Sequence, residues 1–186
     1  RYDDGAAYER MMGTWSRLVG AVFLDWLAPE KGLRWLDVGC GTGALSSTIL
    51  ETADPSSVHG VDPSEGFLAN ARRYVRDPRA RFDIGNAMDL PVESAAYDSA
   101  VSGLVLNFVP KPEQAMAEMH RAVVPGGTVA LYVWDYAGEM QMMRRFWDAA
   151  VALDPQAEKF AEGARFPICK PEPLESLFRG AGFKDV

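Results

Sequence analysis

The sequence predicts an α/β domain whose core is a doubly wound, Rossmann-like, mostly parallel sheet. Apolar segments of strand length alternate with amphipathic segments of helix length from residue 33 to residue 134. Such alternation is typical of parallel strands joined by right-handed helical crossovers. Several of the strand segments are almost continuously apolar, as expected for strands that helices cover on both faces. A glycine-rich turn follows the first of them.

The segment Ala6–Leu27 is predicted to form one or two helices, which end before the helix-breaking segment Pro29–Gly32. The apolar residues that recur at helical spacing in it are Leu18, Val22, Phe23 and Trp26.

The centre of the chain is predicted to hold the strands and the helices that connect them. The strands are expected at Leu33–Val38, Val58–Asp62, Ala80–Ile84, Ser99–Leu106 and Thr128–Trp134. The connecting helices are expected at Ala44–Thr52, Glu65–Val75 and Pro112–Val123. Each helix follows a turn at which the apolar period changes from strand-like to helical.

The last part of the chain is predicted to be mostly helical. A helix over 138–153 is rich in methionine and aromatic residues, and a shorter helix covers Pro173–Phe178. Residues 182–186 have the composition of a strand that is beginning.

Composition limits the classes of function. The chain of 186 residues is 48% hydrophobic and 24% charged, which is ordinary for one soluble globular domain. A net charge of −7 argues against nucleic-acid binding. Cys40 and Cys169 are too far apart for a zinc motif or a disulfide framework, so we expect no metal site and a cytoplasmic location. No apolar run reaches the ~20 residues of a membrane span.

Residues 35–45, WLDVGCGTGAL, are the most informative segment. Gly39, Gly41 and Gly43 remove side chains from a tight strand-to-helix turn, so a ligand can lie against the backbone there. Their G-x-G-x-G spacing differs from the G-x-G-x-x-G that binds a dinucleotide pyrophosphate. With Asp37 two positions before the first glycine, the turn points away from NAD.

This turn resembles motif I of the class I S-adenosylmethionine (SAM) dependent methyltransferases. Further segments match the motifs of that family in the same order over residues 33–134. They are Asp62 in HGVDPS, GNAMDLP at Gly85–Pro91, Tyr97-Asp98, and RAVVPGG at Arg121–Gly127. The most similar subgroup is the type 11 methyltransferases, which include the ubiquinone and menaquinone C-methyltransferases. One departure is Asn86, which stands where the family usually has aspartate.

The resemblance implies SAM as the cofactor and assigns it a set of residues. Asp37 would accept a hydrogen bond from the methionyl ammonium, Asp62 from the ribose hydroxyls, and Asn86 from the adenine amine. The complete set expected to bind the cofactor is Asp37, Gly39, Cys40, Gly41, Thr42, Asp62, Pro63, Ser64, Asn86, Ala87, Met88, Gly103 and Leu104.

The methyl acceptor is expected to be a small hydrophobic molecule, and no catalytic base is evident. Candidates for a catalytic role are Asn107, Asp135 and Tyr136, which follow the predicted fourth and fifth strands. His59 and His120 are interpreted as structural. The domain would comprise a helical lid at 1–28, the cofactor-binding core at 33–134 and a substrate-side helical insertion at 138–170. We expect a monomer or homodimer, with C-terminal strands beyond this sequence.

Two alternatives remain open at this point. The first is an NAD(P)-dependent oxidoreductase, although the glycine spacing disfavours it. The second is a domain that binds SAM without catalysis, because the sequence identifies no base.

Overall fold

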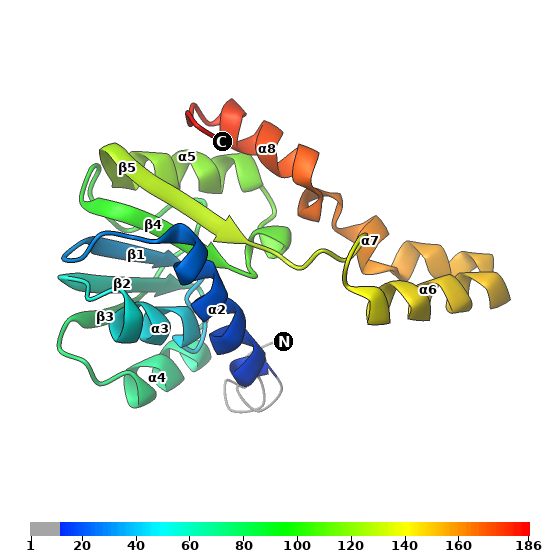
Figure 1. The fold of residues 1–186 in the computed structure, drawn as a ribbon, viewed down its shortest axis with the longest axis horizontal. Helices are drawn as coiled ribbons and strands as arrows, with labels where there is room; N and C mark the ends of the chain where they lie inside the picture. Colours follow the sequence, from blue (N-terminus) through cyan, green and yellow to red (C-terminus); the bar gives the residue numbers. More distant parts are fainter. Residues whose placement is uncertain (1–11) are drawn as a thin grey trace.

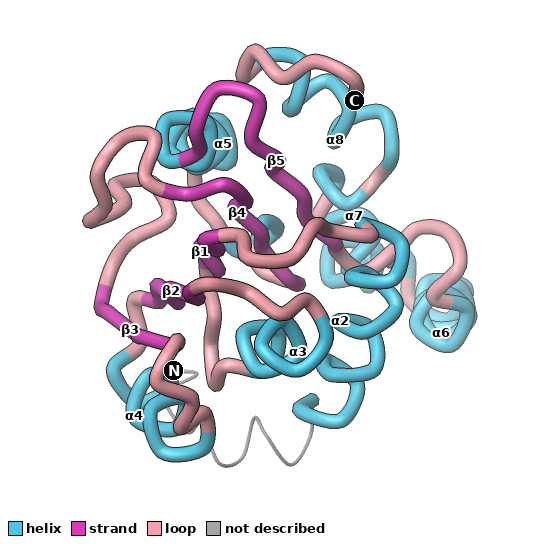
Figure 2. The backbone as a smooth tube through the Cα atoms, turned by 60° about the vertical axis from the view of Figure 1, so that its left-hand side comes forward, coloured by secondary structure: helices cyan, strands magenta, loops and turns pink. Residues whose placement is uncertain are grey.

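A computed structural model describes residues 12–186 as a parallel sheet between two layers of helices (Figures 1 and 2). The sheet has five strands in the order β3-β2-β1-β4-β5, and every pairing is parallel. The strands are β1 Arg34–Val38, β2 Ser57–Asp62, β3 Ala80–Ile84, β4 Tyr97–Gly103 and β5 Val123–Tyr132. The predicted fold class is therefore confirmed. The chain order reverses between β1 and β4, and ligands of such sheets bind beyond the carboxyl ends of the strands at this point.

Helices cover both faces of the sheet (Figure 2). One face carries α2 Thr14–Leu27, α3 Ala44–Thr52 and α4 Glu65–Tyr74, and the other carries α5 Pro112–Ala122 and α8 Pro171–Gly180. The short helix η2 Leu106–Phe108 follows β4. The segment after β5 extends away from the sheet (Figure 1) and consists of α6 Gln141–Leu153, η3 Pro155–Phe160, α7 Glu162–Arg165 and η4 Pro167–Cys169.

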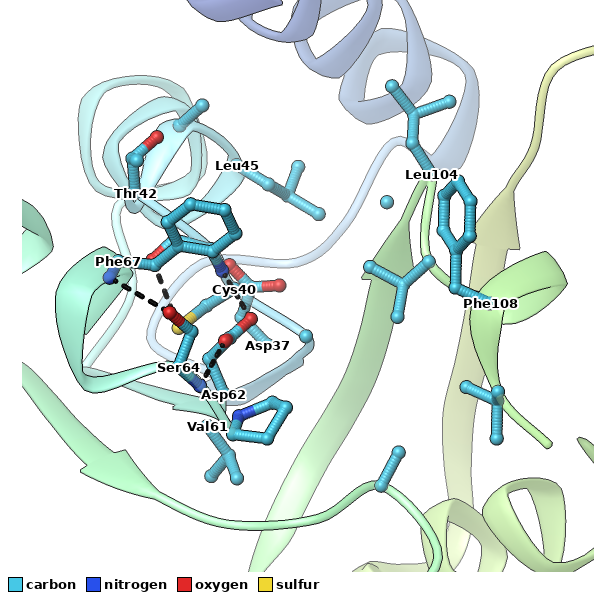
Figure 3. Close-up of a pocket in the computed structure, with 18 of the residues that line it drawn as sticks. Asp37, Cys40, Thr42, Leu45, Val61, Asp62, Ser64, Phe67, Leu104 and Phe108 are labelled. Atoms are coloured by element: carbon cyan, nitrogen blue, oxygen red, sulfur yellow. Dashed lines mark hydrogen bonds between the residues drawn. The ribbon is translucent and has the colours of Figure 1, made fainter. Parts of the chain in front are cut away.

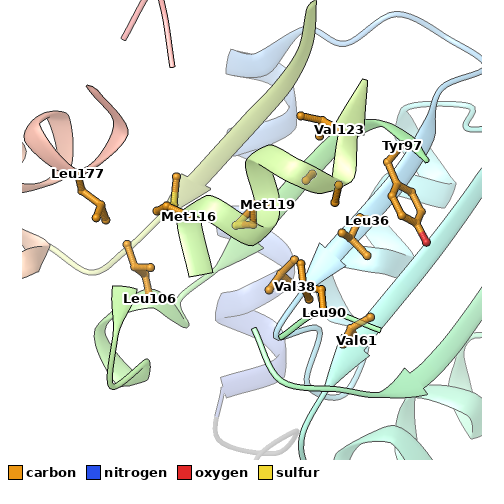
Figure 4. Close-up of a cluster of buried hydrophobic side chains, with 12 residues drawn as sticks. Leu36, Val38, Val61, Leu90, Tyr97, Leu106, Met116, Met119, Val123 and Leu177 are labelled. Atoms are coloured by element: carbon orange, nitrogen blue, oxygen red, sulfur yellow. The ribbon is translucent and has the colours of Figure 1, made fainter. Parts of the chain in front are cut away.

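The sheet separates two hydrophobic cores because successive strand residues point to opposite faces. On β1, Trp35 packs with α2 and α3, whereas Leu36 packs with α5 and α8 (Figure 4). Both side chains are fully buried. This double burial fixes the register of β1, whose carboxyl end leads into the glycine turn.

The N-terminal helix confirms the predicted element from Thr14 onward, and its earlier residues up to 11 lie outside the described part. Its packing differs from the predicted stripe. Phe23 is buried, but Leu18, Val22 and Trp26 are 57%, 69% and 72% exposed. The buried face of α2 instead consists of Ser16, Gly20, Phe23 and Leu24, and Phe23 and Leu24 pack in one cluster with side chains of α3.

Several strand boundaries differ from the prediction, and the largest differences are at the end of β4 and the start of β5. β4 ends at Gly103 because Leu104 adopts a left-handed φ of 61° and its N–H donates to the Tyr132 carbonyl. β5 begins at Val123, earlier than predicted, because Val123 already pairs with Tyr97 before a register shift. The predicted bounds of α3 and β3 match the structure to the residue.

The predicted C-terminal strand is not observed, since residues 182–186 pair with no described strand and form a turn and an irregular end. The last helix is longer than predicted and begins at Pro171, where proline suits the first turn of a helix.

Candidate active site

A cavity of about 540 Å³ opens at the carboxyl ends of the strands, around the reversal point between β1 and β4 (Figure 3). Its walls come from the turn after β1, the ends of β2, β4 and β5, the loop after β3, η2 and the first turn of α2. Figure 3 shows Asp37 and Asp62 at one end of this cavity and Leu104 and Phe108 at the other. We call these the cofactor end and the acceptor end.

The glycine turn is bound to the neighbouring strand β2. The N–H groups of Gly39 and Cys40 donate to the Val61 carbonyl at 2.7 and 3.1 Å. Gly39 has a φ of 75°, and a Cβ added to it would lie 2.5 Å from a methyl carbon of Val105. Only glycine combines a left-handed φ with the absence of a Cβ that would clash with Val105. Gly39 therefore allows the ends of β1, β2 and β4 to come together.

Asp62 organises the cofactor end through its two carboxylate oxygens. Oδ2 accepts from the Gly41 N–H at 3.0 Å, and Oδ1 accepts from the Ser64 N–H at 2.8 Å. Burial raises the pKa of this carboxyl, while these two backbone donors oppose the shift. A carboxylate has about four lone-pair sites, so Asp62 can still accept hydrogen bonds from a ligand in the cavity.

Asp37 is almost fully buried beside it, at 1% exposure. The Ser46 hydroxyl donates to Oδ2 at 2.6 Å, but Oδ1 has no hydrogen-bond partner among the described residues. Burial raises the pKa of Asp37 to about 7, and the nearby charge of Asp62 adds to the effect. A buried acceptor without a partner is costly, so this oxygen suits a cationic or hydrogen-bond-donating ligand group.

Most of the residues predicted to bind the cofactor line this cavity. They are Asp37, Gly39, Cys40, Gly41, Thr42, Asp62, Pro63, Ser64, Asn86, Ala87, Gly103 and Leu104. Met88 is not among the described lining residues, because its N–H donates to Asn86 Oδ1 at 2.9 Å and closes a turn. Burial raises the pKa of the Cys40 thiol well above its usual value, so Cys40 stays protonated and unreactive.

Only one of the three candidate catalytic residues reaches the cavity. Tyr136 lines it, whereas Asn107 and Asp135 do not. The Asp135 carboxylate instead accepts from the backbone N–H groups of Gly138 and Glu139, each at 2.9 Å. The Asn107 side-chain amide is buried without a partner among the described residues.

The cavity also contains residues outside the predicted set, and most of them are apolar or aromatic. Those in the described chain are Met12, Ser16, Ala44, Leu45, Val61, Phe67, Gly85, Val105, Phe108, Val109, Pro110, Tyr132 and Trp134. Phe108 follows the predicted fourth strand and Trp134 is the last residue of the predicted fifth strand, and these positions were the available signal. Met12 and Ser16, which both belong to the segment predicted as a lid, line the cavity just before and within the first turn of α2.

The described residues hold no group of three or more His, Cys, Asp or Glu side chains placed to bind a metal ion. Within the same part of the chain, no helix is long and apolar enough to span a membrane.

Comparison with known proteins identifies the family. The family model described as methyltransferase domain matches residues 36–131, from β1 to β5. The chain belongs to this family. SAM is the cofactor of the solved relative described below, and the orphaned Asp37 oxygen fits the cationic ammonium of SAM. The family assignment sets the NAD(P) alternative aside.

Individual relatives agree with this assignment. An uncharacterised 37.1 kDa protein in a transposon of Streptomyces fradiae is 30% identical over 185 residues, covering 91% of this chain. The chain spans only 54% of the length of that relative. Demethylmenaquinone methyltransferase of Staphylococcus aureus is 27% identical over 84% of this chain and 70% of its own.

A SAM-dependent methyltransferase of Thermotoga maritima, described as a possible histamine N-methyltransferase, has a similar crystal structure. It is 26% identical, with a TM-score of 0.72 over 97% of this chain and 78% of its own.

Proposed function

We propose that this methyltransferase domain transfers the methyl group of SAM to a small hydrophobic molecule held at the acceptor end of the cavity. The observation that carries the proposal is the polarity of the cavity. Two buried carboxylates lie at the cofactor end, beside Leu45, Val61 and Phe67, whereas the acceptor end is lined by aromatic and aliphatic side chains without a charged group (Figure 3). SAM supplies a methyl group activated by an adjacent cationic sulfur.

The cofactor end provides acceptors for the donor groups of SAM. Asp37 Oδ1 is the acceptor for the methionyl ammonium, since a cation there relieves the cost of its burial. Asp62 accepts the ribose hydroxyls with the lone pairs that Gly41 and Ser64 leave unused. Asn86 and Ala87, in the loop after β3, lie where the adenine would reach.

The acceptor end favours an uncharged substrate. Tyr132, Trp134 and Tyr136 line it together with Phe108, and the described lining contains no lysine, arginine or histidine. An anionic acceptor would therefore meet no opposite charge and would approach two carboxylates. The Staphylococcus aureus relative is named for demethylmenaquinone as its substrate, and the acceptor proposed here is of the same uncharged kind.

Methyl transfer at this site would depend chiefly on alignment. The described lining offers no histidine as a general base, so holding the acceptor atom ~3 Å from the methyl carbon is the main contribution of the protein. We propose a cytoplasmic location, which two free, buried cysteines support, and a monomer or homodimer.

Calorimetric titration with SAM, S-adenosylhomocysteine (SAH) and NADH tests the cofactor part. We expect micromolar binding of the two sulfur compounds and none of NADH. Incubation with methyl-labelled SAM and a panel of neutral phenols and quinols tests the transfer step. Label in an organic-extractable product supports the proposal. Tight SAH binding without transfer to any neutral acceptor would favour the non-catalytic SAM-binding alternative.

A further inference from the structure

Aromatic rings from three distant segments meet at the acceptor end. Phe108 comes from η2, Tyr136 follows β5, and Phe166 lies between α7 and η4. The Phe166 ring centroid is 5.5 Å from that of Phe108, with the planes at 74°, and 5.7 Å from that of Tyr136, with the planes at 35°. Phe108 and Tyr136 line the cavity, whereas Phe166 contacts them from outside the described lining.

We propose that Phe166 is a positioning residue for the acceptor, which holds the rings of Phe108 and Tyr136 as the wall against which a flat, neutral aromatic acceptor stacks. This inference rests on the proposed function. Phe108 is 62% exposed, so few other contacts restrict its ring. An edge-to-face contact on one side limits the rotation of such a ring and leaves its open face for a ligand.

The position of Phe166 is itself fixed by short-range hydrogen bonds. Its N–H donates to the Glu162 carbonyl at 2.8 Å, and its own carbonyl accepts from the Cys169 N–H at 3.0 Å. Cys169 is buried at 5% exposure and lies two residues before the start of α8, which packs on the sheet through Leu177. Phe166 is therefore anchored to the core on its C-terminal side. On its N-terminal side it is held by Glu162, whose carboxylate accepts a hydrogen bond from the Trp147 indole of α6.

The charges around the three rings agree with a neutral ligand. The Arg165 guanidinium lies 5.1 Å from the centroid of the Phe166 ring, and Arg165 is not among the described residues that line the cavity. The guanidinium interacts with the aromatic ring of Phe166, so it does not add a positive charge to the acceptor end. Stacking on Phe108 and Tyr136 is the interaction left for the acceptor.

Binding of 2-naphthol, a flat and neutral probe, tests the proposal by calorimetry on protein saturated with SAH. We expect Phe166→Ala to weaken 2-naphthol binding about tenfold while its SAH affinity stays within about twofold of the wild type. Phe166→Tyr keeps the ring and should restore probe binding. Phe160→Ala is the matched control, since this ring is 55% exposed and its recorded partner is Lys159.

The outcomes separate this proposal from the proposed function. Unchanged probe affinity in Phe166→Ala would overturn the positioning role, as would an equal loss of probe and SAH affinity, which indicates a purely structural residue. Wild-type protein that binds SAH but not 2-naphthol would refute the aromatic wall and leave the cofactor assignment intact. Failure of the wild type to bind SAH would refute the proposed function itself.

With a methylated acceptor in hand, steady-state kinetics gives a second readout. Phe166→Ala should raise the KM for the acceptor about tenfold and leave the KM for SAM unchanged. A fall in kcat at constant acceptor KM would contradict the proposal.

Discussion

The two ends of the cavity are built in different ways. At the cofactor end, Asp37 and Asp62 are 1% and 7% exposed, and hydrogen bonds of 2.6 to 3.0 Å hold them. At the acceptor end, Phe108 is 62% exposed and its recorded aromatic contact comes from Phe166, far along the chain. The cofactor end is thus a rigid polar site made by neighbouring strands, whereas the acceptor end is an apolar surface made by long-range packing.

The two ends also differ in what they cost the folded protein: the buried carboxylates of the cofactor end lower the free energy of unfolding in the absence of ligand. A buried, incompletely paired carboxylate is unfavourable until its ligand arrives, so the cofactor end should gain stability when its charges are removed. The aromatic rings of the acceptor end carry no such cost.

The largest effect should come from removing the charge of Asp37. Its pKa is about 7 in the folded protein against an ordinary 3.8, so the folded state keeps a proton that the unfolded state releases. The free energy of unfolding should therefore fall as pH rises from about 4 to 7, by up to about 4 kcal/mol. Asp37→Asn abolishes this loss and should be more stable than the wild type at pH 8.

Urea unfolding of ligand-free protein at pH 4.5 and pH 8 measures this difference. Asp25→Asn, which removes an exposed carboxylate on α2, is the control and should follow the wild type. Equal pH dependence of the wild type and Asp37→Asn would show that Asp37 is already ionised and paired.

Asp62→Asn should weaken SAH binding about a hundredfold, close to 3 kcal/mol, because charge-assisted hydrogen bonds to the ligand are lost. The asparagine side chain has one acceptor oxygen and one NH2 group. Its NH2 group would therefore face the N–H of either Gly41 or Ser64, and that hydrogen bond would be lost. Calorimetry gives the dissociation constant. Asp83→Asn, on β3 and paired with His59 outside the described cavity lining, should stay within about twofold. A similar loss in both variants would argue against a direct role for Asp62.

Gly39→Ala should lower the free energy of unfolding by about 2 kcal/mol, as two penalties add. One is the left-handed backbone, at about 1 kcal/mol, and the other is the contact with Val105. Gly32→Ala separates them, because Gly32 has a φ of 76° but nothing within 4 Å of an added Cβ. It should lose about 1 kcal/mol. Identical losses would mean that Val105 moves aside freely.

The smallest effect is expected on α6, where no residue is buried. Leu153 is 89% exposed, so Leu153→Ser should change the free energy of unfolding by less than about 0.5 kcal/mol. A destabilisation above about 1 kcal/mol in chemical denaturation would show that this face of α6 is covered in solution.

The features that could be predicted from the sequence are those that depend on the spacing of neighbouring residues. The glycine turn, Asp62 at the end of β2 and the exact bounds of α3 follow from residue type and period over a few neighbouring positions. Ser46 escaped prediction, although it contacts Asp37, since nothing in an amphipathic pattern distinguishes one helical serine from another.

The features that depend on distant contacts were not predictable in the same way. β4 ends early because Leu104 adopts a left-handed φ, although its N–H still donates to the Tyr132 carbonyl on another strand. Phe166 reaches the cavity wall only through the path of α7 and η4, and periodicity does not encode that path. The exposure of Leu18, Val22 and Trp26 depends on which face of α2 packs on α3, where Gly20 faces Leu45 and Thr48.

The outward face of α2 also has a consequence for handling the protein. Four large apolar residues form one stripe along this helix, Trp15, Leu18, Val22 and Trp26, each between 57% and 72% exposed. A stripe of this kind is where non-specific association begins. The net charge of −7 opposes it by mutual repulsion, with a range of about 10 Å at 0.1 M salt that shrinks as salt is added. Concentrated samples should therefore stay dispersed best in dilute buffer, and ammonium sulfate should bring them out of solution early.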